Sequence, residues 1–313
     1  MRILLTGGTG FIGRHVLPKL GGHTVLLLTR SKARAPGGVQ VLEGDLADLA
    51  GLQGPIKEFA PECCVHLAWE GRPDYSQEQC NKNRMLSTQL FNLLVDETKC
   101  ARIVAAGTRS EYAALRGALK EDDPVDSPGD LALAKKQLFN CGMALANTCD
   151  IQFYWLRLFS VYGPGQRPDC LLPTLAMRFQ EERIRRLTPT TKHHFDADVK
   201  YEVLTPANAH DFIHVDDAAA AIAAAVTANA PSGAYNVGTG CAVKVAKVCG
   251  LMEKKLAGRR DYTRTLKSRP RKNSEGAWAD LTKTRTALGW EPKYDIAVGI
   301  DRCLRADRFG QTI

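Results

Sequence analysis

The sequence contains no apolar run long enough to cross a membrane and no opening stretch typical of a secretory signal. Its most apolar candidate, residues 218–226, is rich in alanine and much shorter than the roughly 20 residues that a membrane helix needs. The chain begins Met-Arg-Ile-Leu-Leu-Thr, which is typical of a strand that enters a turn. We therefore expect these residues to belong to the fold, the protein to be cytoplasmic and its partners to include no membrane.

Cysteine motifs that mark zinc fingers or disulfide frameworks are also absent. The ten cysteines include no Cys-x-x-Cys pair, so free thiols in a reducing compartment are the expected state. His193, His194, Asp196 and Asp198 are close in sequence, but their polar stretch has no predicted helix to hold ligands on one face. We predict no metal site.

The charge of the chain is positive without being concentrated. There are 42 Lys and Arg residues against 34 Asp and Glu, a net charge of +8. A nucleic-acid-binding protein gathers such charge on one face or in one run, whereas here it clusters only loosely, at residues 181–186 and 259–272. We predict no nucleic-acid partner, and the excess favours a small anionic ligand.

The composition, with 44% apolar and 24% charged residues, is that of an ordinary globular protein. In the first half, short apolar runs typical of strands buried on both faces alternate with helix-length segments. Strands are predicted at residues 2–5, 24–28, 39–43, 63–68, 101–106 and 153–158, and helices at 12–20, 46–59, 79–98 and 131–147. This alternation predicts an α/β fold, a doubly wound parallel sheet of the Rossmann type.

The alternation ends after about residue 165. A helix at 171–182, a strand at 199–204 and several mixed elements follow. We predict a Rossmann domain at residues 1–168, to which 211–238 return. Residues 169–210 and 239–313 are expected to form a smaller C-terminal substrate-binding lobe over the edge of the sheet.

A glycine-rich turn follows the first predicted strand and opens the first helix. Gly7, Gly10 and Gly13 have the spacing that permits a tight turn, close approach of a pyrophosphate and close helix–strand packing. The free N–H groups and the helix dipole face the phosphates in such a turn. The position inside a strand–helix–strand unit predicts a dinucleotide site that also includes Phe11 and Ile12.

The end of the second strand indicates which dinucleotide is bound. An acid there suits the ribose diol of NAD, whereas an arginine suits the 2′-phosphate of NADP, and this chain has Arg30. We therefore expect NADP(H) rather than NAD(H). Asp45, after the third strand, is expected either near the adenine amino group or as a helix N-cap.

From its motifs the chain resembles the extended short-chain dehydrogenase/reductase family, the nucleotide-sugar epimerases, dehydratases and reductases. The resemblance covers nearly the whole chain. Besides the glycine turn, it is carried by Gly44-Asp45-Leu46, His66-Leu67-Ala68-Trp69, Asn83, residues 157–165, Asp211-Phe212-Ile213-His214, residues 235–240 and Leu288-Gly289-Trp290-Glu291-Pro292. It adds Leu46, Leu67, Ala68, Trp69, Asn83 and Lys135 to the expected cofactor-binding residues.

The resemblance implies hydride transfer between a nicotinamide and a sugar carbon, usually C4. A Ser or Thr after the fifth strand holds the sugar oxygen, and Thr108 matches that position, with Ser110 as a nearby substitute. A Tyr-x-x-x-Lys pair on the next helix supplies the acid and base, because the lysine lowers the pKa of the tyrosine. Lys135 matches the lysine.

Leu131 stands where this tyrosine is expected, and leucine can neither donate nor accept a proton. Three interpretations stay open. Another acid operates, for which Tyr112 and Glu111 are candidates; or Leu131 is a natural or engineered change that impairs an intact site; or the chain is a regulatory cofactor-binding protein without turnover.

The run from Gly107 to Tyr112 resembles the loop of 4-keto-6-deoxy-sugar nucleotide reductases such as CDP-abequose and CDP-paratose synthases. Together with Arg30 it favours an NADP-dependent reductase acting at C4 of a nucleotide-linked 4-keto-6-deoxy sugar. The alternative is a nucleotide-sugar C4 epimerase.

The resemblance also implies substrate contacts and a homodimer. Thr108, Ser160, Arg178 and Arg269 lie where the family places substrate-binding groups. Family members form homodimers through the two helices predicted at residues 79–98 and from 131. The apolar residues on these helices suit either an interface or the sheet-facing core, and we favour core for Phe91, Leu94, Leu138 and Phe139.

Overall fold

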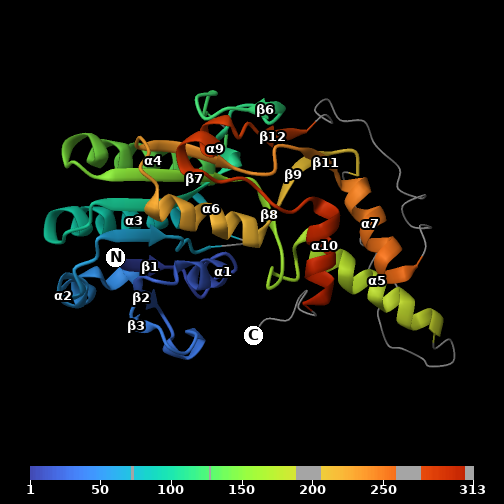
Figure 1. Ribbon diagram of the computed structural model, residues 1–313, viewed down its shortest axis with the longest axis horizontal. Coiled ribbons are helices and arrows are strands. Elements are labelled where there is room, and N and C mark those ends of the chain that lie inside the picture. The colour runs from blue at the N-terminus through green and yellow to red at the C-terminus, as the bar shows by residue number, and fades with distance from the viewer. Residues whose placement is uncertain (72–73, 127, 188–205, 259–275, 307–313) are drawn as a thin grey trace.

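The computed structural model describes residues 1–71, 74–126, 128–187, 206–258 and 276–306. Seven strands form one parallel sheet in the order β10-β7-β5-β4-β1-β2-β3. These strands are β1 (Arg2–Thr6), β2 (Thr24–Thr29), β3 (Gln40–Glu43), β4 (Cys63–His66), β5 (Arg102–Thr108), β7 (Gln152–Leu158) and β10 (Gly233–Val237). The predicted doubly wound parallel sheet is confirmed (Figure 1).

Helices cover both faces of this sheet. One face carries α1 (Gly13–Val16), the 3₁₀ turn η1 (Leu17–Leu20) and α6 (Val215–Thr227), whereas the other carries α2 (Leu49–Phe59), α3 (Gln77–Glu97) and α4 (Asp130–Thr148). Successive strand residues alternate between the two cores, so that Leu4 belongs to one and Leu5 to the other. Burial on both faces explains why the strands are continuously apolar in sequence.

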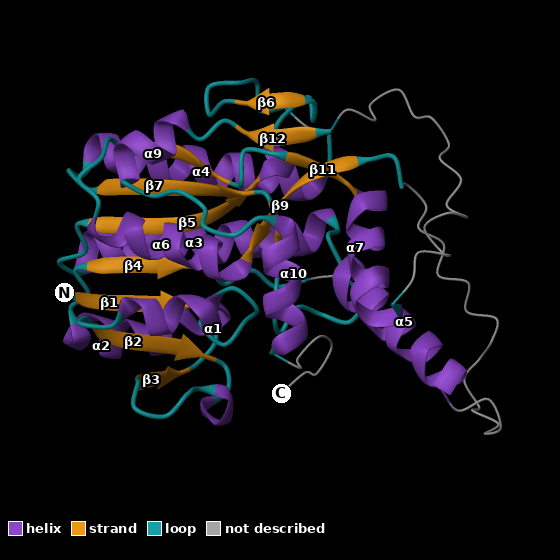
Figure 2. Cartoon of the chain, turned by 45° about the vertical axis from the view of Figure 1, so that its right-hand side comes forward, coloured by secondary structure: helices purple, strands orange, loops and turns teal. Residues whose placement is uncertain are grey.

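A second, five-stranded sheet lies beyond the carboxyl ends of the large one (Figure 2). Its strands are β6 (Gly117–Leu119), β8 (Ser160–Tyr162), β9 (Ala209–His214), β11 (Ala242–Lys244) and β12 (Ala277–Ala279). A third apolar cluster joins α5 (Leu171–Leu187), α7 (Val245–Ala257) and α10 (Ile296–Arg305). The remaining elements are α9 (Thr282–Leu288) and the 3₁₀ turns η2 (Lys32–Arg34), η3 (Leu46–Asp48) and η4 (Arg109–Glu111).

The six strands and four helices predicted in the first half are all present, with shifted ends. The sequence analysis did not predict β6, β8, β11, β12, α9 or α10. The four strands have three residues each, too few to show a period, whereas the ten residues of α10 were enough to show one. β10 joins the large sheet whereas β9 belongs to the small one, and the division into domain and lobe stays a prediction. The strand expected at 199–204 falls outside the described residues, and within them no helix is long and apolar enough to span a membrane.

Candidate active site

The glycine turn is held against the segment that follows β4. Gly7 has φ +70°, and a Cβ atom on it would lie 2.6 Å from the Ala68 nitrogen. A Cβ atom on Gly13 would lie 2.1 Å from the Gly7 carbonyl oxygen. Neither position tolerates a side chain, so the main chain itself forms the floor of the turn at the carboxyl edge of the sheet.

A cavity of about 310 Å³ opens beside this turn. Nine of the predicted cofactor residues line it: Gly7, Gly10, Arg30, Asp45, Leu46, Leu67, Ala68, Trp69 and Asn83. Phe11, Ile12, Gly13 and Lys135 are not part of this lining. The buried Trp69 indole N–H has no hydrogen-bond acceptor among the described residues, as expected of a donor that a ligand would satisfy. The residues present therefore fit a dinucleotide.

Asp45 both lines the cavity and caps a helical turn, so the two alternatives expected for it are compatible. It lines the cavity, and its Oδ1 accepts a hydrogen bond from the Ala47 N–H at 2.9 Å, which caps η3. The cap fixes the carboxylate at the rim of the cavity, where it is available to a ligand donor.

Arg30, at the end of β2, already has an acidic partner. It forms an ion pair with Glu70, and Lys82 Nζ lies 3.6 Å from the other Glu70 oxygen. The hydrogen bond from Arg30 is the main cause of the lowered pKa of Glu70. Asn83 fixes the backbone of Glu70, because its side chain accepts from the Glu70 N–H at 2.8 Å and donates to the Glu70 carbonyl at 2.7 Å. A phosphate at Arg30 would therefore meet a carboxylate already in place.

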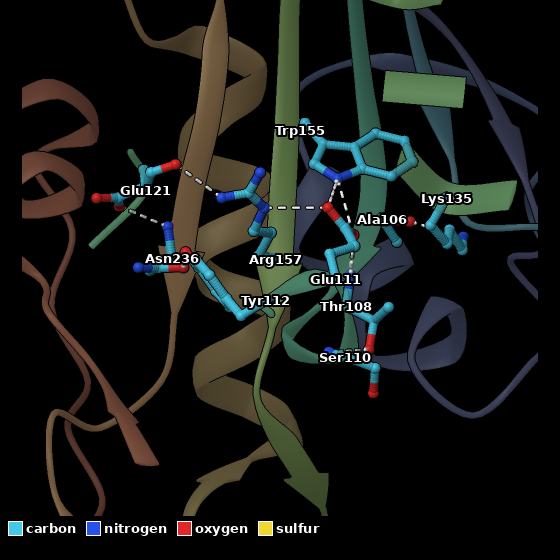
Figure 3. Close-up of polar contacts among 10 residues, drawn as sticks. All are labelled: Ala106, Thr108, Ser110, Glu111, Tyr112, Glu121, Lys135, Trp155, Arg157 and Asn236. Atoms are coloured by element: carbon cyan, nitrogen blue, oxygen red, sulfur yellow. Dashed lines mark hydrogen bonds and ion pairs between the residues drawn. The ribbon is translucent and has the colours of Figure 1, made fainter. Parts of the chain in front are cut away.

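Thr108 ends β5 and caps η4. Its hydroxyl oxygen accepts from the Ser110 N–H at 3.2 Å, while Glu111 Oε1 accepts from the Thr108 N–H at 2.7 Å. This reciprocal capping box leaves the Thr108 hydroxyl hydrogen to donate elsewhere. The predicted hydroxyl is thus held rigidly at the carboxyl edge of the sheet, with Ser110 beside it (Figure 3).

Glu111 is a structural anion and does not suit the role of a proton donor. The Trp155 indole N–H donates to both of its oxygens at 3.0 Å, and Arg157 Nε donates to Oε2 at 3.0 Å. Both partners of the Glu111–Arg157 ion pair are almost completely buried. Figure 3 shows the carboxylate between the indole and the guanidinium.

Tyr112, the other candidate acid, points away from Lys135. Its hydroxyl donates to Asn236 Oδ1 at 2.6 Å, and burial raises its pKa to about 12. In Figure 3 it lies on the opposite side of Arg157 from Lys135. These contacts argue against both candidate acids, because each is engaged in holding β7 and β10 to the loop after β5.

Lys135 lies in an apolar slot under the carboxyl end of β5. Its Nζ donates to the Ala106 carbonyl at 2.8 Å and sits 3.7 Å from the ring centre of Trp69 and 5.5 Å from that of Trp155. Burial lowers its pKa to about 7. Leu131, one turn earlier on α4, is only half-buried and adds no polar group to the site.

The structure does not bring the expected substrate residues together by direct contacts. Ser160 is half-buried at the start of β8, next to the carboxyl end of β7. Arg178 lies on α5, where its charge acts on the Cys249 thiol of α7. Arg269 lies outside the described residues, as do His193 and His194.

The sequence analysis missed a cation beside the candidate hydroxyl. Burial lowers the pKa of Arg109, and its acidic neighbour Asp211 accepts hydrogen bonds from Thr239, Gly240 and Ala279. No described residue forms an ion pair with Arg109. An arginine directly after the expected hydroxyl was the available signal, as was the Thr-x-x-Glu spacing for the capping box.

Comparisons with known proteins agree with this geometry. A family model described as "NAD dependent epimerase/dehydratase family" matches residues 3–238. A probable dTDP-glucose 4,6-dehydratase of Sinorhizobium fredii is 25% identical over 96% of this chain and 91% of that protein. UDP-glucuronate 4-epimerase 5 of Arabidopsis thaliana is 26% identical over 97% and 75%. The structure of Bordetella bronchiseptica WbmG in complex with NAD has a TM-score of 0.78 at 21% identity, covering 99% of this chain and 95% of that one.

Proposed function

Because the chain belongs to the NAD dependent epimerase/dehydratase family, we propose that it carries out hydride transfer at C4 of a nucleotide-linked sugar. The expectation of a nicotinamide-dependent oxidoreductase or epimerase is confirmed at the level of this family. The finer proposal is NADP-dependent reduction of a 4-keto-6-deoxy sugar, and the alternative is C4 epimerisation.

One observation carries the proposal: the fixed Thr108 hydroxyl and the Lys135 amine approach the same end of β5. Thr108 would hold the C4 oxygen of the sugar. The nicotinamide, when bound along the glycine turn, supplies or accepts the hydride. Arg109 and Ser160, at the same edge, are candidates for contact with the rest of the sugar nucleotide, whose negative charge suits Arg109.

The proposed preference for NADP rests on the cations around the adenosine end of the cavity. Arg30 and Arg34 both line it, and either can pair with a 2′-phosphate. Binding would move Arg30 from Glu70 to the phosphate. The preference is therefore a balance between the attraction of Arg30 and the repulsion of Glu70.

We also propose a homodimer through α3 and α4, which pack side by side. Phe91, Leu94 and Leu138 are fully buried in the core, as favoured from the sequence, so they are not free to form an interface. Met85 and Leu133 are instead 49% and 48% exposed. Light scattering tests this proposal: Leu133→Glu should halve the mass of the particle.

The test of the function follows nicotinamide absorbance after NADPH is mixed with a panel of nucleotide-linked 4-keto-6-deoxy sugars. Stoichiometric loss of NADPH with one sugar supports the reductase. If no sugar consumes NADPH although NADPH binds, the reductase is excluded. Interconversion of C4 epimers without net loss of cofactor would then support the epimerase.

A further inference from the structure

The proposed reaction needs a proton donor, and the expected tyrosine is replaced by Leu131. The two candidate acids on the loop after β5, Glu111 and Tyr112, are engaged in other contacts. Glu111 is paired with Arg157, and the Tyr112 hydroxyl is held by Asn236. The donor must therefore come from another element that reaches the end of β5.

Lys135 reaches this end from α4. Its Nζ makes one described hydrogen bond, to the Ala106 carbonyl at 2.8 Å, so two further N–H groups remain available. The Ala106 carbonyl that holds the Lys135 Nζ lies two residues, about 7 Å along β5, before Thr108, and Trp69, whose ring faces this Nζ, also lines the cavity beside the glycine turn. A sugar oxygen bound by Thr108 at this end of β5 would be reached by the flexible lysine, directly or through one water.

The surroundings of Lys135 do not fix it as a permanent cation. No carboxylate of the described residues bonds to it, whereas the faces of Trp69 and Trp155, 3.7 and 5.5 Å from its Nζ, attract the charged form. The charged or titratable groups that act on it are Glu111 of η4 and Cys80 of α3, while His66 of β4 is affected by its charge. Burial outweighs these attractions and lowers the pKa of the amine, so Lys135 gives up its proton more easily than an exposed lysine.

We propose that Lys135 itself replaces the missing tyrosine as the proton donor, a role that rests on the proposed C4 reduction. The carbonyl oxygen at C4 takes a proton from the Lys135 ammonium while C4 gains a hydride, so the C=O bond becomes H–C–O–H. Lys135 is left as a neutral amine and regains its proton from solvent. In the epimerase alternative the same amine accepts the hydroxyl proton in the oxidative half.

The lowered pKa of about 7 agrees with this role, because both forms of the amine are then populated near neutral pH. The apolar side chain of Leu131 also agrees with a lysine acid. A tyrosine acid needs a charged lysine nearby, whereas a lysine acid needs an apolar neighbour that does not stabilise its charge.

The first test does not depend on turnover. The full chain, labelled with ¹³C at the lysine ε-carbons, is titrated by NMR. One resonance should move with a midpoint near pH 7, and it should be missing in Lys135→Arg but present in Lys136→Arg, the matched control at the half-exposed neighbouring lysine. A Lys135 resonance that stays in its charged position up to pH 9 overturns the proposal.

The second test uses the reaction. NADPH oxidation by the wild type should fall about tenfold per pH unit above pH 7, and Lys135→Arg should lose about 100-fold or more while still binding NADPH. Lys136→Arg should match the wild type. A Lys135→Arg enzyme with wild-type rate and pH profile refutes the proposal. If no sugar is reduced, the reductase fails separately, and the NMR midpoint alone supports or overturns Lys135 as a group that can release a proton.

Discussion

Glu111 and Arg157 form an ion pair at 3.0 Å with side chains only 1% and 2% exposed. The pair spans the loop after β5 and the strand β7, and Arg157 continues to the Glu121 carbonyl at 2.8 Å. Because Glu111 also accepts from the Thr108 N–H, the position of the candidate hydroxyl depends on a contact that lies wholly inside the protein.

Breaking this pair should therefore destabilise the protein and displace Thr108. We expect Glu111→Gln to lower the free energy of unfolding by about 3–5 kcal/mol, because it leaves a buried guanidinium without its anion. Urea unfolding measures the loss. The matched control is Asp126→Asn, which breaks the exposed pair with Lys136 and should cost at most about 1 kcal/mol. Equal effects of the two substitutions would contradict the role given to burial.

Restoring the tyrosine should change the pH dependence of turnover. A Leu131→Tyr enzyme gains an acid that keeps its proton well above pH 7, so its rate should exceed that of the wild type by about tenfold at pH 8–9. The measurement is the pH profile of NADPH oxidation. Leu131→Phe supplies the same ring without the hydroxyl and should show no gain; a gain of equal size would attribute the effect to packing.

The cofactor preference should respond to Glu70 and Arg30 in opposite directions. Glu70→Gln removes a carboxylate that competes with the 2′-phosphate, so NADP should bind about tenfold tighter relative to NAD. Arg30→Ala should weaken NADP binding by about tenfold or more and leave NAD binding almost unchanged. Titration calorimetry measures the dissociation constants of NADP and of NAD for each variant and for the wild type. Equal changes for NADP and NAD would show that neither residue senses the phosphate.

Burial of Lys135 should also appear in the pH dependence of stability. Its pKa is about 7 in the folded chain and roughly 10.4 in the unfolded one, so between these values only the unfolded chain holds the proton. The free energy of unfolding should therefore rise with pH in this window, by about 1.4 kcal/mol per unit. Subtracting the curve of Lys135→Met from that of the wild type isolates this slope; parallel curves would show that Lys135 titrates normally when folded.

The fold and the residues that line the cavity beside the glycine turn could be predicted because they depend on local patterns. Gly13 is required by main-chain contacts within the glycine turn, the Gly7–Gly10–Gly13 spacing is itself local, and the strands are apolar throughout since both faces are covered. The contacts of the candidate acids on the loop after β5 could not be predicted in the same way. Tyr112 follows Thr108 closely in sequence, yet its hydroxyl donates to Asn236, which lies 124 residues later in the chain.

The role of Arg157 could not be predicted from the sequence either. It occurs inside an apolar strand, where its residue type gives no hint of a partner. Its role becomes visible only when the loop after β5 places Glu111 against it. The Thr108-x-x-Glu111 spacing is that of a capping box, so the structural role of Glu111 is visible in the sequence.

The small sheet also constrains when the protein can fold during synthesis. β6 ends at Leu119, yet the strand that pairs with it, β12, begins at Ala277. About half of the chain must leave the ribosome between the two, so this pairing has a high sequence separation and forms late. β6 is the last strand of the small sheet, so until then it lacks its one neighbouring strand and exposes both edges to other nascent chains, and a product truncated before Ala277 would do so permanently. Such truncation products are expected to aggregate even though the glycine turn and, once the chain extends past Val237, all seven strands of the large sheet are complete.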